Sequence, residues 1–184
     1  GEHGGKVRDK PAKQKNGSEL PVKSWHEKFD WDKDIPSQEY FDELFRVSKH
    51  QIIFGINYFV ERRNIPIGSG RIIWDKVNSG NFSDCEIAGC SLHKTTRLVR
   101  YMWNGMLQGK SIRHGSIQQG NKKLNEKRIH PTQKPRILYQ WLAQQYFQEN
   151  WLILDTHVGS ASSLIAYELE GFQYVGFEKE KQYY

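Results

Sequence analysis

Residues 151–180, WLILDTHVGSASSLIAYELEGFQYVGFEKE, decide the fold of this 184-residue chain. An apolar run leads into the carboxylate of Asp155, and a Gly-Ser turn follows at residues 159–160. An amphipathic run then ends at Gly171, a residue type that commonly closes a helix, and a second apolar run stops at Glu178. The stretch therefore predicts a strand, a turn, a helix and a second strand.

Strands that alternate with helices at this spacing predict an α/β fold with a mostly parallel sheet and helices on both faces. In the helix after the Gly-Ser turn, the predicted apolar stripe consists of Ala161, Leu164, Ile165 and Leu169. An earlier helix is predicted within residues 36–50, with Ser37 as its N-cap. Another is predicted to begin at Pro135, with an apolar face made of Ile137, Leu138, Trp141, Leu142 and Tyr146.

The remaining residues predict short strands and long polar connections. Residues 51–55 and 71–75 are rich in β-branched residues and predict strands, while residues 56–70 predict a loop with a short turn. Between residues 77 and 129 the chain is polar and has few apolar runs, although residues 97–104 are predicted as one strand. Residues 1–24 are polar and basic and predict a loop or arm.

Composition excludes several classes of protein. The chain is 37% hydrophobic, which suits one packed domain, and it has no apolar run near the roughly 18 residues that a membrane span needs. Its two cysteines, Cys85 and Cys90, are too few for a disulfide scaffold and fit a reduced, cytoplasmic setting. With His93 they lack further metal ligands nearby, so we interpret them as buried small hydrophobic residues and expect no metal.

Charge is distributed unevenly along the chain. The basic segment, residues 94–128, holds nine Lys or Arg and one acid, a net charge of +8 where the whole chain carries +6. Residues 150–184 hold five acids and two lysines, a net charge of −3. This contrast predicts that the basic segment binds a polyanion and that the acidic end binds a different ligand.

Asp155 and Glu178 lie where an open α/β sheet binds its ligands, beyond the carboxyl ends of neighbouring strands. An acid at the second strand end, where Glu178 lies, can accept hydrogen bonds from both hydroxyls of a ribose. Asp155 would repel the pyrophosphate of a dinucleotide, whereas S-adenosylmethionine carries a cationic amino-acid end and no phosphate. The pattern thus favours S-adenosylmethionine as cofactor. The alternative is that both carboxylates merely cap helices on a solvated surface.

Several motifs in order resemble a known family, the DNA methyltransferases that modify the exocyclic amine of adenine (N6) or cytosine (N4). The resemblance runs from about residue 30 to the end, and its most specific pair is HPTQKP followed by LDTHVGSASS. The order, with the cofactor motif near the C-terminus, is similar to that of a permuted subgroup. The matching stretches are FGINYF (54–59), RIIWDK (71–76), FSDCEIAGCS (82–91), HPTQKP (130–135), LDTHVGSASS (154–163) and VGFEKEKQYY (175–184).

The resemblance implies a Rossmann-like methyltransferase fold, S-adenosylmethionine as cofactor and double-stranded DNA as substrate. Glu178 would hold the ribose, and Thr132 and Lys134 would lie near the cofactor carboxylate, where a lysine suits the charge. HPTQKP alone could also be a proline-rigidified entry into a helix. The residues that would line the cofactor are Asp155, Thr156, His157, Gly159, Ser160, Glu178, Thr132 and Lys134.

Three departures from the family pattern stand out. His157 replaces a usual aromatic residue, and Ala161 replaces a usual glycine, so its β-carbon is expected to crowd the turn. The catalytic Asp/Asn-Pro-Pro-Tyr tetrad of the family does not occur in these residues. In the resembling subgroup it lies just upstream of the position of Gly1, so we expect a truncated chain whose catalytic residues are unknown.

The basic segment falls where such enzymes place target recognition. Tyr101 and Trp103, interleaved with its cations, are expected to stack on bases, although the segment could instead be a solvated loop. The chain is therefore expected to form one methyltransferase domain, with an arm (1–29), a catalytic half (30–76), a recognition region (77–129) and a cofactor-binding half (130–184). The predicted DNA-contacting residues are Arg97, Arg100, Lys110, Arg113, Lys122 and Lys123.

Two other functions compete with a DNA methyltransferase. A catalytically inactive nucleic-acid-binding module that retains the fold is consistent with the missing tetrad. A nicotinamide-dependent oxidoreductase is disfavoured by Asp155 and by the lack of a G-x-G-x-x-G turn. The target base, the recognition sequence and the oligomeric state cannot be predicted from these residues.

Overall fold

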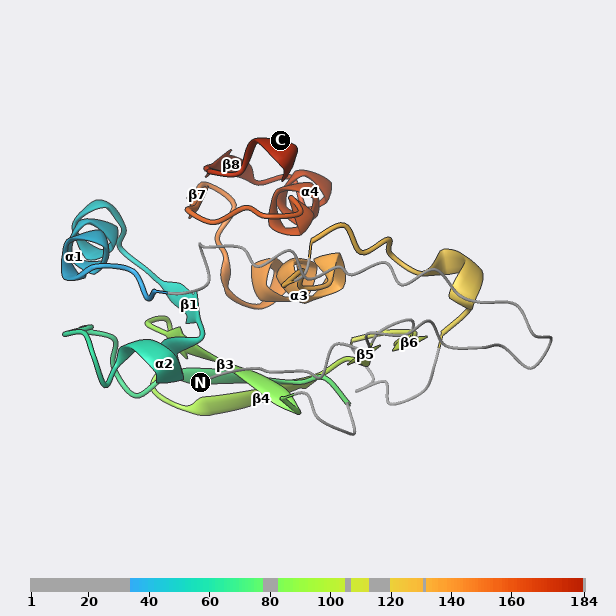
Figure 1. The fold of residues 1–184 in the computed structure, drawn as a ribbon, viewed down its shortest axis with the longest axis horizontal. Helices are drawn as coiled ribbons and strands as arrows, with labels where there is room; N and C mark the ends of the chain where they lie inside the picture. Colours follow the sequence, from blue (N-terminus) through green and yellow to red (C-terminus); the bar gives the residue numbers. More distant parts are fainter. Residues whose placement is uncertain (1–33, 78–82, 105–106, 113–119, 131, 184) are drawn as a thin grey trace, which may run out of the picture. The chain divides into compact units, whose positions relative to one another are not determined.

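The computed structural model describes residues 34–77, 83–104, 107–112, 120–130 and 132–183. The chain divides into two compact units, residues 1–36 and 37–184, and the fold described here is that of the second. The predicted arm, residues 1–29, lies outside the described residues. The elements in order (Figure 1) are α1 (Gln38–Val47), β1 (Ile52–Phe54), α2 (Ile56–Phe59), β2 (Arg71–Asp75), β3 (Cys85–Cys90), β4 (Thr96–Arg100), β5 (Trp103–Asn104), β6 (Leu107–Gln108), η2 (Lys122–Leu124), α3 (Arg136–Tyr146), β7 (Leu152–Asp155), α4 (Ser162–Leu169), β8 (Gln173–Gly176) and η3 (Lys181–Tyr183).

The main sheet is mixed, which corrects the expected mostly parallel sheet. Its order is β1-β3-β2-β4, with β3 antiparallel to both β1 and β2, and β4 parallel to β2. Strands β7 and β8 form a separate parallel pair, and β5 and β6 an antiparallel pair. The connection from β2 to β3, residues 76–84, is too short for a crossover, so the two strands run in opposite directions.

Strand β3 lies between β1 and β2 in this sheet, although its sequence was not predicted as a strand. Residues 77–129, which were predicted to be mainly polar, therefore contain a core strand in addition to the basic segment. The predicted strand at residues 97–104 divides instead into β4 and β5. The predicted turn after β1 is a one-turn helix, α2.

Helix α1 begins as predicted, because the Ser37 hydroxyl accepts a hydrogen bond from the Tyr40 backbone N–H at 3.3 Å. Helix α3 begins directly after Pro135, also as predicted. No helix among the described residues is long and apolar enough to cross a membrane.

Helix α3 packs against both the main sheet and α4. Its Leu138 and Leu142 are buried with Ile72 and Trp74 of β2, whereas its Ala143 is buried with residues of α4. In Figure 1, α3 accordingly lies between the main sheet and the layer that holds α4, β7 and β8.

The buried face of α4 differs from the predicted stripe. Ile165 and Leu169 are 46% and 60% exposed, while Ser163, Ala166 and Tyr167 are buried. Small residues at the contact allow the axis of α3 to approach closely, and Tyr167 packs edge-on against Tyr139 of α3. Leu164 of the predicted stripe does pack against this cluster, whereas the prediction was wrong for Ile165 and Leu169.

Candidate functional site

The carboxyl ends of β7 and β8 bring the two predicted carboxylates to one edge. Asp155 is in register with Gly176, and Glu178 follows two residues later. The Oε2 atom of Glu178 accepts a hydrogen bond from the Gly159 backbone N–H at 2.6 Å, and Oε1 accepts one from Glu180 N–H at 2.8 Å. Glu178 thus closes the β7–α4 turn (residues 155–161) onto the end of β8.

Backbone donors keep Glu178 ionised. Burial alone would raise the pKa of its carboxyl, but the amides of Glu180, Gly159 and Lys179, with a contribution from His130, lower the pKa below its usual value. Each carboxylate oxygen retains a further lone pair for a ligand hydroxyl. The site therefore offers a permanently charged acceptor at neutral pH.

Asp155 organises the turn from within. Its Oδ1 accepts a hydrogen bond from His157 N–H at 2.9 Å, and its Oδ2 accepts one from the Ser163 hydroxyl at the start of α4. The carboxylate therefore shapes the path of the chain between β7 and α4.

Thr156, His157 and Ser160 occupy different sides of this turn. The Thr156 hydroxyl lies 2.7 Å from the phenol oxygen of Tyr40 on α1 and 3.0 Å from Nδ1 of His157. The Ser160 hydroxyl is buried and lies 2.9 Å from that of Ser162. Tyr40 was not among the predicted site residues, since nothing near it in the sequence indicates a contact with Thr156, 116 positions away.

Two residues of the turn have left-handed backbone conformations. Gly159 has φ +56°, which glycine tolerates without strain. Ala161 has φ +58°, a region that its β-carbon disfavours. The cost at Ala161 is therefore one of backbone conformation, and crowding of the turn by its β-carbon stays a prediction.

The HPTQKP motif places the ring of His130 beside the β7–α4 turn. A β-carbon placed on Gly159 would lie 3.7 Å from atoms of the His130 ring, and that ring packs on Tyr183 with centroids 4.3 Å apart. Nδ1 of His130 accepts a hydrogen bond from Thr132 N–H at 3.2 Å, so the neutral ring carries its proton on Nε2. Burial lowers the pKa of His130, against an opposing effect of Glu178 and with a smaller contribution from Lys134 in the same direction as burial.

Lys134 of the same motif is held by the main sheet. The Nζ atom of Lys134 lies 3.1 Å from Oε2 of Glu86 and 5.0 Å from the centre of the Phe54 ring. The other carboxylate oxygen of Glu86, Oε1, lies 2.8 Å from Nζ of Lys76. With two lysines for one glutamate, the cluster retains a net charge of +1. The structure therefore pairs Lys134 with Glu86 and leaves the surroundings attractive to an anion.

The predicted DNA-contacting residues are exposed wherever the structure describes them. Arg97 and Arg100 lie on β4, an edge strand of the main sheet, and Arg100 also forms an ion pair with Asp75 at 2.8 Å. Lys122 and Lys123 lie on η2, next to Leu124, which is 81% exposed. Lys110 is exposed as well, and Arg113 lies outside the described residues.

Tyr101 and Trp103 do not have the expected role. Both belong to the core, at 7% and 6% exposure, and the Trp103 indole N–H donates to the Gln133 carbonyl at 3.0 Å. Their rings are therefore not available to stack on bases.

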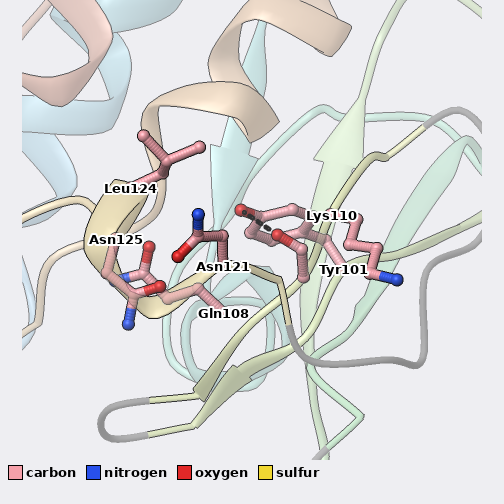
Figure 2. A pocket seen from close by; sticks show the side chains of 7 residues that line it. Tyr101, Gln108, Lys110, Asn121, Leu124 and Asn125 are labelled. Atoms are coloured by element: carbon pink, nitrogen blue, oxygen red, sulfur yellow. Dashed lines mark hydrogen bonds between the residues drawn. The ribbon is translucent and has the colours of Figure 1, made fainter.

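A cavity of about 400 Å³ opens beside the buried Tyr101 ring (Figure 2). The Tyr101 hydroxyl donates to the Gly109 carbonyl at 3.3 Å. Amide side chains dominate the polar part of the lining, which consists of Tyr101, Gln108, Gly109, Lys110, Asn121, Leu124 and Asn125.

Comparison with known proteins gives three findings. The family model of N6/N4 methyltransferases, described as DNA methylase, matches residues 9–184. The chain is 26% identical over 145 residues to the type II methyltransferase M2.LlaDCHI of Lactococcus lactis subsp. cremoris. The aligned region covers 71% of the chain and 53% of that protein. It thus spans about half the length of this relative. The crystal structure of the M1.HpyAVI–SAM complex shares its fold, with a TM-score of 0.53, 21% identity, and coverage of 81% of this chain and 79% of that one.

Proposed function

The chain belongs to the N6/N4 DNA methylase family, and on that premise we propose that it transfers a methyl group from S-adenosylmethionine to adenine N6 or cytosine N4 in DNA. We further propose that the protein is cytoplasmic and acts within a restriction–modification system. The observation that supports it is the position of the His130 ring beside Gly159 and Glu178, because it brings the two most specific motifs to one site.

The residues present fit the proposed cofactor. Glu178 has acceptor sites left for two ribose hydroxyls after its bonds to Gly159 and Glu180. Asp155 adds a second negative charge at the same edge, which suits a cationic amino-acid end and opposes a pyrophosphate. Thr132 and the positively charged cluster around Lys134 would lie toward the cofactor carboxylate.

When bound, the cofactor would supply a methyl group on a sulfonium sulfur. An amine nitrogen would attack the methyl carbon in line as the C–S bond breaks, releasing S-adenosylhomocysteine and one amine proton to solvent. The role of this chain would be to hold the cofactor beside the β7–α4 turn. The exposed cations of the basic segment would bring DNA to the cofactor. Those cations would contact phosphates, which fix the position of the duplex without reading its sequence.

Titration calorimetry with S-adenosylhomocysteine tests the cofactor site. We expect Glu178→Ala to weaken binding about 5- to 150-fold, because it leaves the ribose hydroxyls without a charged acceptor. Glu180→Ala removes the same charge two residues later and leaves the carboxylate of Glu178 in place, so it serves as the matched control. Equal affinities of the parent and Glu178→Ala would refute the assignment of the ribose site.

Radiolabel transfer to duplex DNA tests the reaction itself. Because the 184 residues contain no Asp/Asn-Pro-Pro-Tyr tetrad, we expect no incorporation by them alone and incorporation once a segment that supplies the tetrad is joined to them. Nucleoside analysis of that product would identify N6-methyladenine or N4-methylcytosine. Binding of both ligands without incorporation by either protein would instead identify a binding module that retains the fold.

A further inference from the structure

Glu126 is the only acid in the basic segment, and its carboxylate points inward to two helix starts. Oε2 accepts a hydrogen bond at 2.9 Å from the backbone N–H of Arg136, the first residue of α3. Oε1 accepts one at 3.0 Å from the hydroxyl of Ser162, the first residue of α4. Its negative charge is thus placed where the unpaired amides and dipoles of both helices favour it.

The backbone of Glu126 forms two hydrogen bonds with the side chain of Gln108. The Gln108 side chain donates to the Glu126 carbonyl at 2.7 Å and accepts from its N–H at 2.8 Å. Gln108 belongs to β6, within the basic segment. The carboxylate is further fixed by the Gln133 amide of the HPTQKP motif, which donates to Oε1 at 3.0 Å.

These bonds form a continuous path from the basic segment to the β7–α4 turn. It runs from Gln108 to Glu126, then to Ser162, and from there to Ser160 at 2.9 Å. Gln108, Ser162 and Ser160 are 5%, 4% and 9% exposed. Glu126 itself is half-buried. Water therefore has little access to three of the four residues, which strengthens the hydrogen bonds that join them.

We propose that Glu126 is a positioning residue that couples DNA binding by the basic segment to cofactor binding by the β7–α4 turn. This inference rests on the proposed function, since it needs both ligands. A change in the position of Gln108 on DNA binding displaces the Glu126 backbone, and its carboxylate carries the shift to the first turn of α4. Ser160 then moves relative to Gly159, which Glu178 holds.

The test measures the affinity for S-adenosylhomocysteine with and without duplex DNA in the full 184-residue chain. For the parent, we expect DNA to change the dissociation constant about 5-fold or more, the usual scale of coupling between two sites. In Glu126→Gln the ratio of the two constants should approach one, since the neutral amide cannot accept all three bonds. Ser162→Ala breaks only the link to the turn and should also bring the ratio toward one.

Glu43→Gln is the matched control, because it makes the same change in an exposed ion pair with Arg46 on α1. A merely structural role would weaken both affinities and leave their ratio unchanged. A parent ratio of one, or a parental ratio in Glu126→Gln and Ser162→Ala, would overturn the proposal.

Hydrogen exchange of the ligand-free chain separates this inference from the proposed function. In Glu126→Gln and Ser162→Ala, we expect faster exchange of backbone amides at both residues 107–112 and residues 156–162, with β2 and β3 unchanged. If the parent binds no S-adenosylhomocysteine, the proposed function fails, and exchange still decides whether Glu126 couples the two segments. Exchange that stays parental in either segment would overturn the coupling.

Discussion

At the scale of single residues, the β7–α4 turn contains a residue, Ala161, whose side chain disfavours the backbone conformation that it adopts. Gly159 and Ala161 both adopt left-handed φ values, and only the glycine does so without cost. The strain at Ala161 is local, since the N–H of Ile165 still donates to its carbonyl at 3.0 Å.

We predict that Ala161→Gly stabilises the chain by about 1 kcal/mol, because the left-handed conformation costs an L-residue roughly that amount. Urea unfolding followed by circular dichroism measures the change. Ala166→Gly is the control, since it makes the same replacement at a buried position inside α4 and should destabilise the chain by about 1 kcal/mol or more. A destabilised Ala161→Gly would show that the β-carbon contributes packing that outweighs the strain.

His130 predicts how stability depends on pH. Because burial lowers its pKa in the folded chain, the unfolded chain binds the proton more readily. The stability that follows is complete above the ordinary pKa of about 6.5 and is lost as the pH falls through the lower folded value. Protonation would also remove the acceptor for Thr132 N–H.

We therefore expect the melting temperature of the parent to fall between pH 7 and pH 5 more than that of His130→Asn. Asn retains an acceptor near the position of Nδ1 and does not titrate in this range. The other six histidines are common to both proteins, so the difference between the two curves reports His130. Parallel curves would contradict this assignment.

At the scale of elements, Glu86 connects β3 to the segment that precedes α3. Its ion pairs with Lys76 and Lys134 are mostly shielded, with the side chains of the two lysines 18% and 19% exposed. Burial favours the neutral form of Glu86, but both lysines outweigh this and lower its pKa. Removal of the acid would leave two shielded cations facing each other.

We predict that Glu86→Gln destabilises the chain by about 2 kcal/mol, below the full cost of breaking a buried pair because water still reaches the cluster. Glu43→Gln, in the exposed pair with Arg46, should cost much less, because water screens an exposed ion pair. Urea unfolding of the three proteins provides the comparison. Equal costs for the two variants would show that the cluster contributes no more than a surface ion pair.

At the scale of the whole molecule, the described residues show two surfaces of opposite charge. Exposed cations occupy the edge strand β4 and the short helix η2, whereas Asp155 and Glu178 gather at the ends of β7 and β8. Each surface suits a ligand that the other would repel, which allows a polyanion and a cationic cofactor to bind at the same time.

We predict that log affinity for duplex DNA falls linearly with log salt, with a slope of about 0.9 for each phosphate contacted. Replacement of Lys122 and Lys123 by Ala should flatten this slope by up to about 2 and weaken different sequences alike. Fluorescence anisotropy over a series of salt concentrations measures it, with a double replacement of Lys49 and Arg62 as a control outside the basic segment. A slope equal to that of the parent would show that η2 faces solvent in the complex.

The features that the sequence alone determined are those that depend on neighbours along the chain. Ser37, Pro135 and Gly171 end or begin helices as predicted, because caps act on backbone groups within a few residues. The two carboxylates also met at one edge as predicted, since parallel strands joined by a helix bring their carboxyl ends together.

Only the tertiary structure decided the features that depend on distant partners. Strand β3 has a weak pattern of its own and is held between β1 and β2 by their hydrogen bonds. Tyr40 and Thr156 lie 116 positions apart, and Lys134 finds Glu86 on another element. Glu126 reads in the sequence as one acid among many cations, and only the approach of α3, α4 and β6 gives its carboxylate and backbone their partners. Such contacts form between residues far apart in the sequence, so they leave no local periodicity from which they could be predicted.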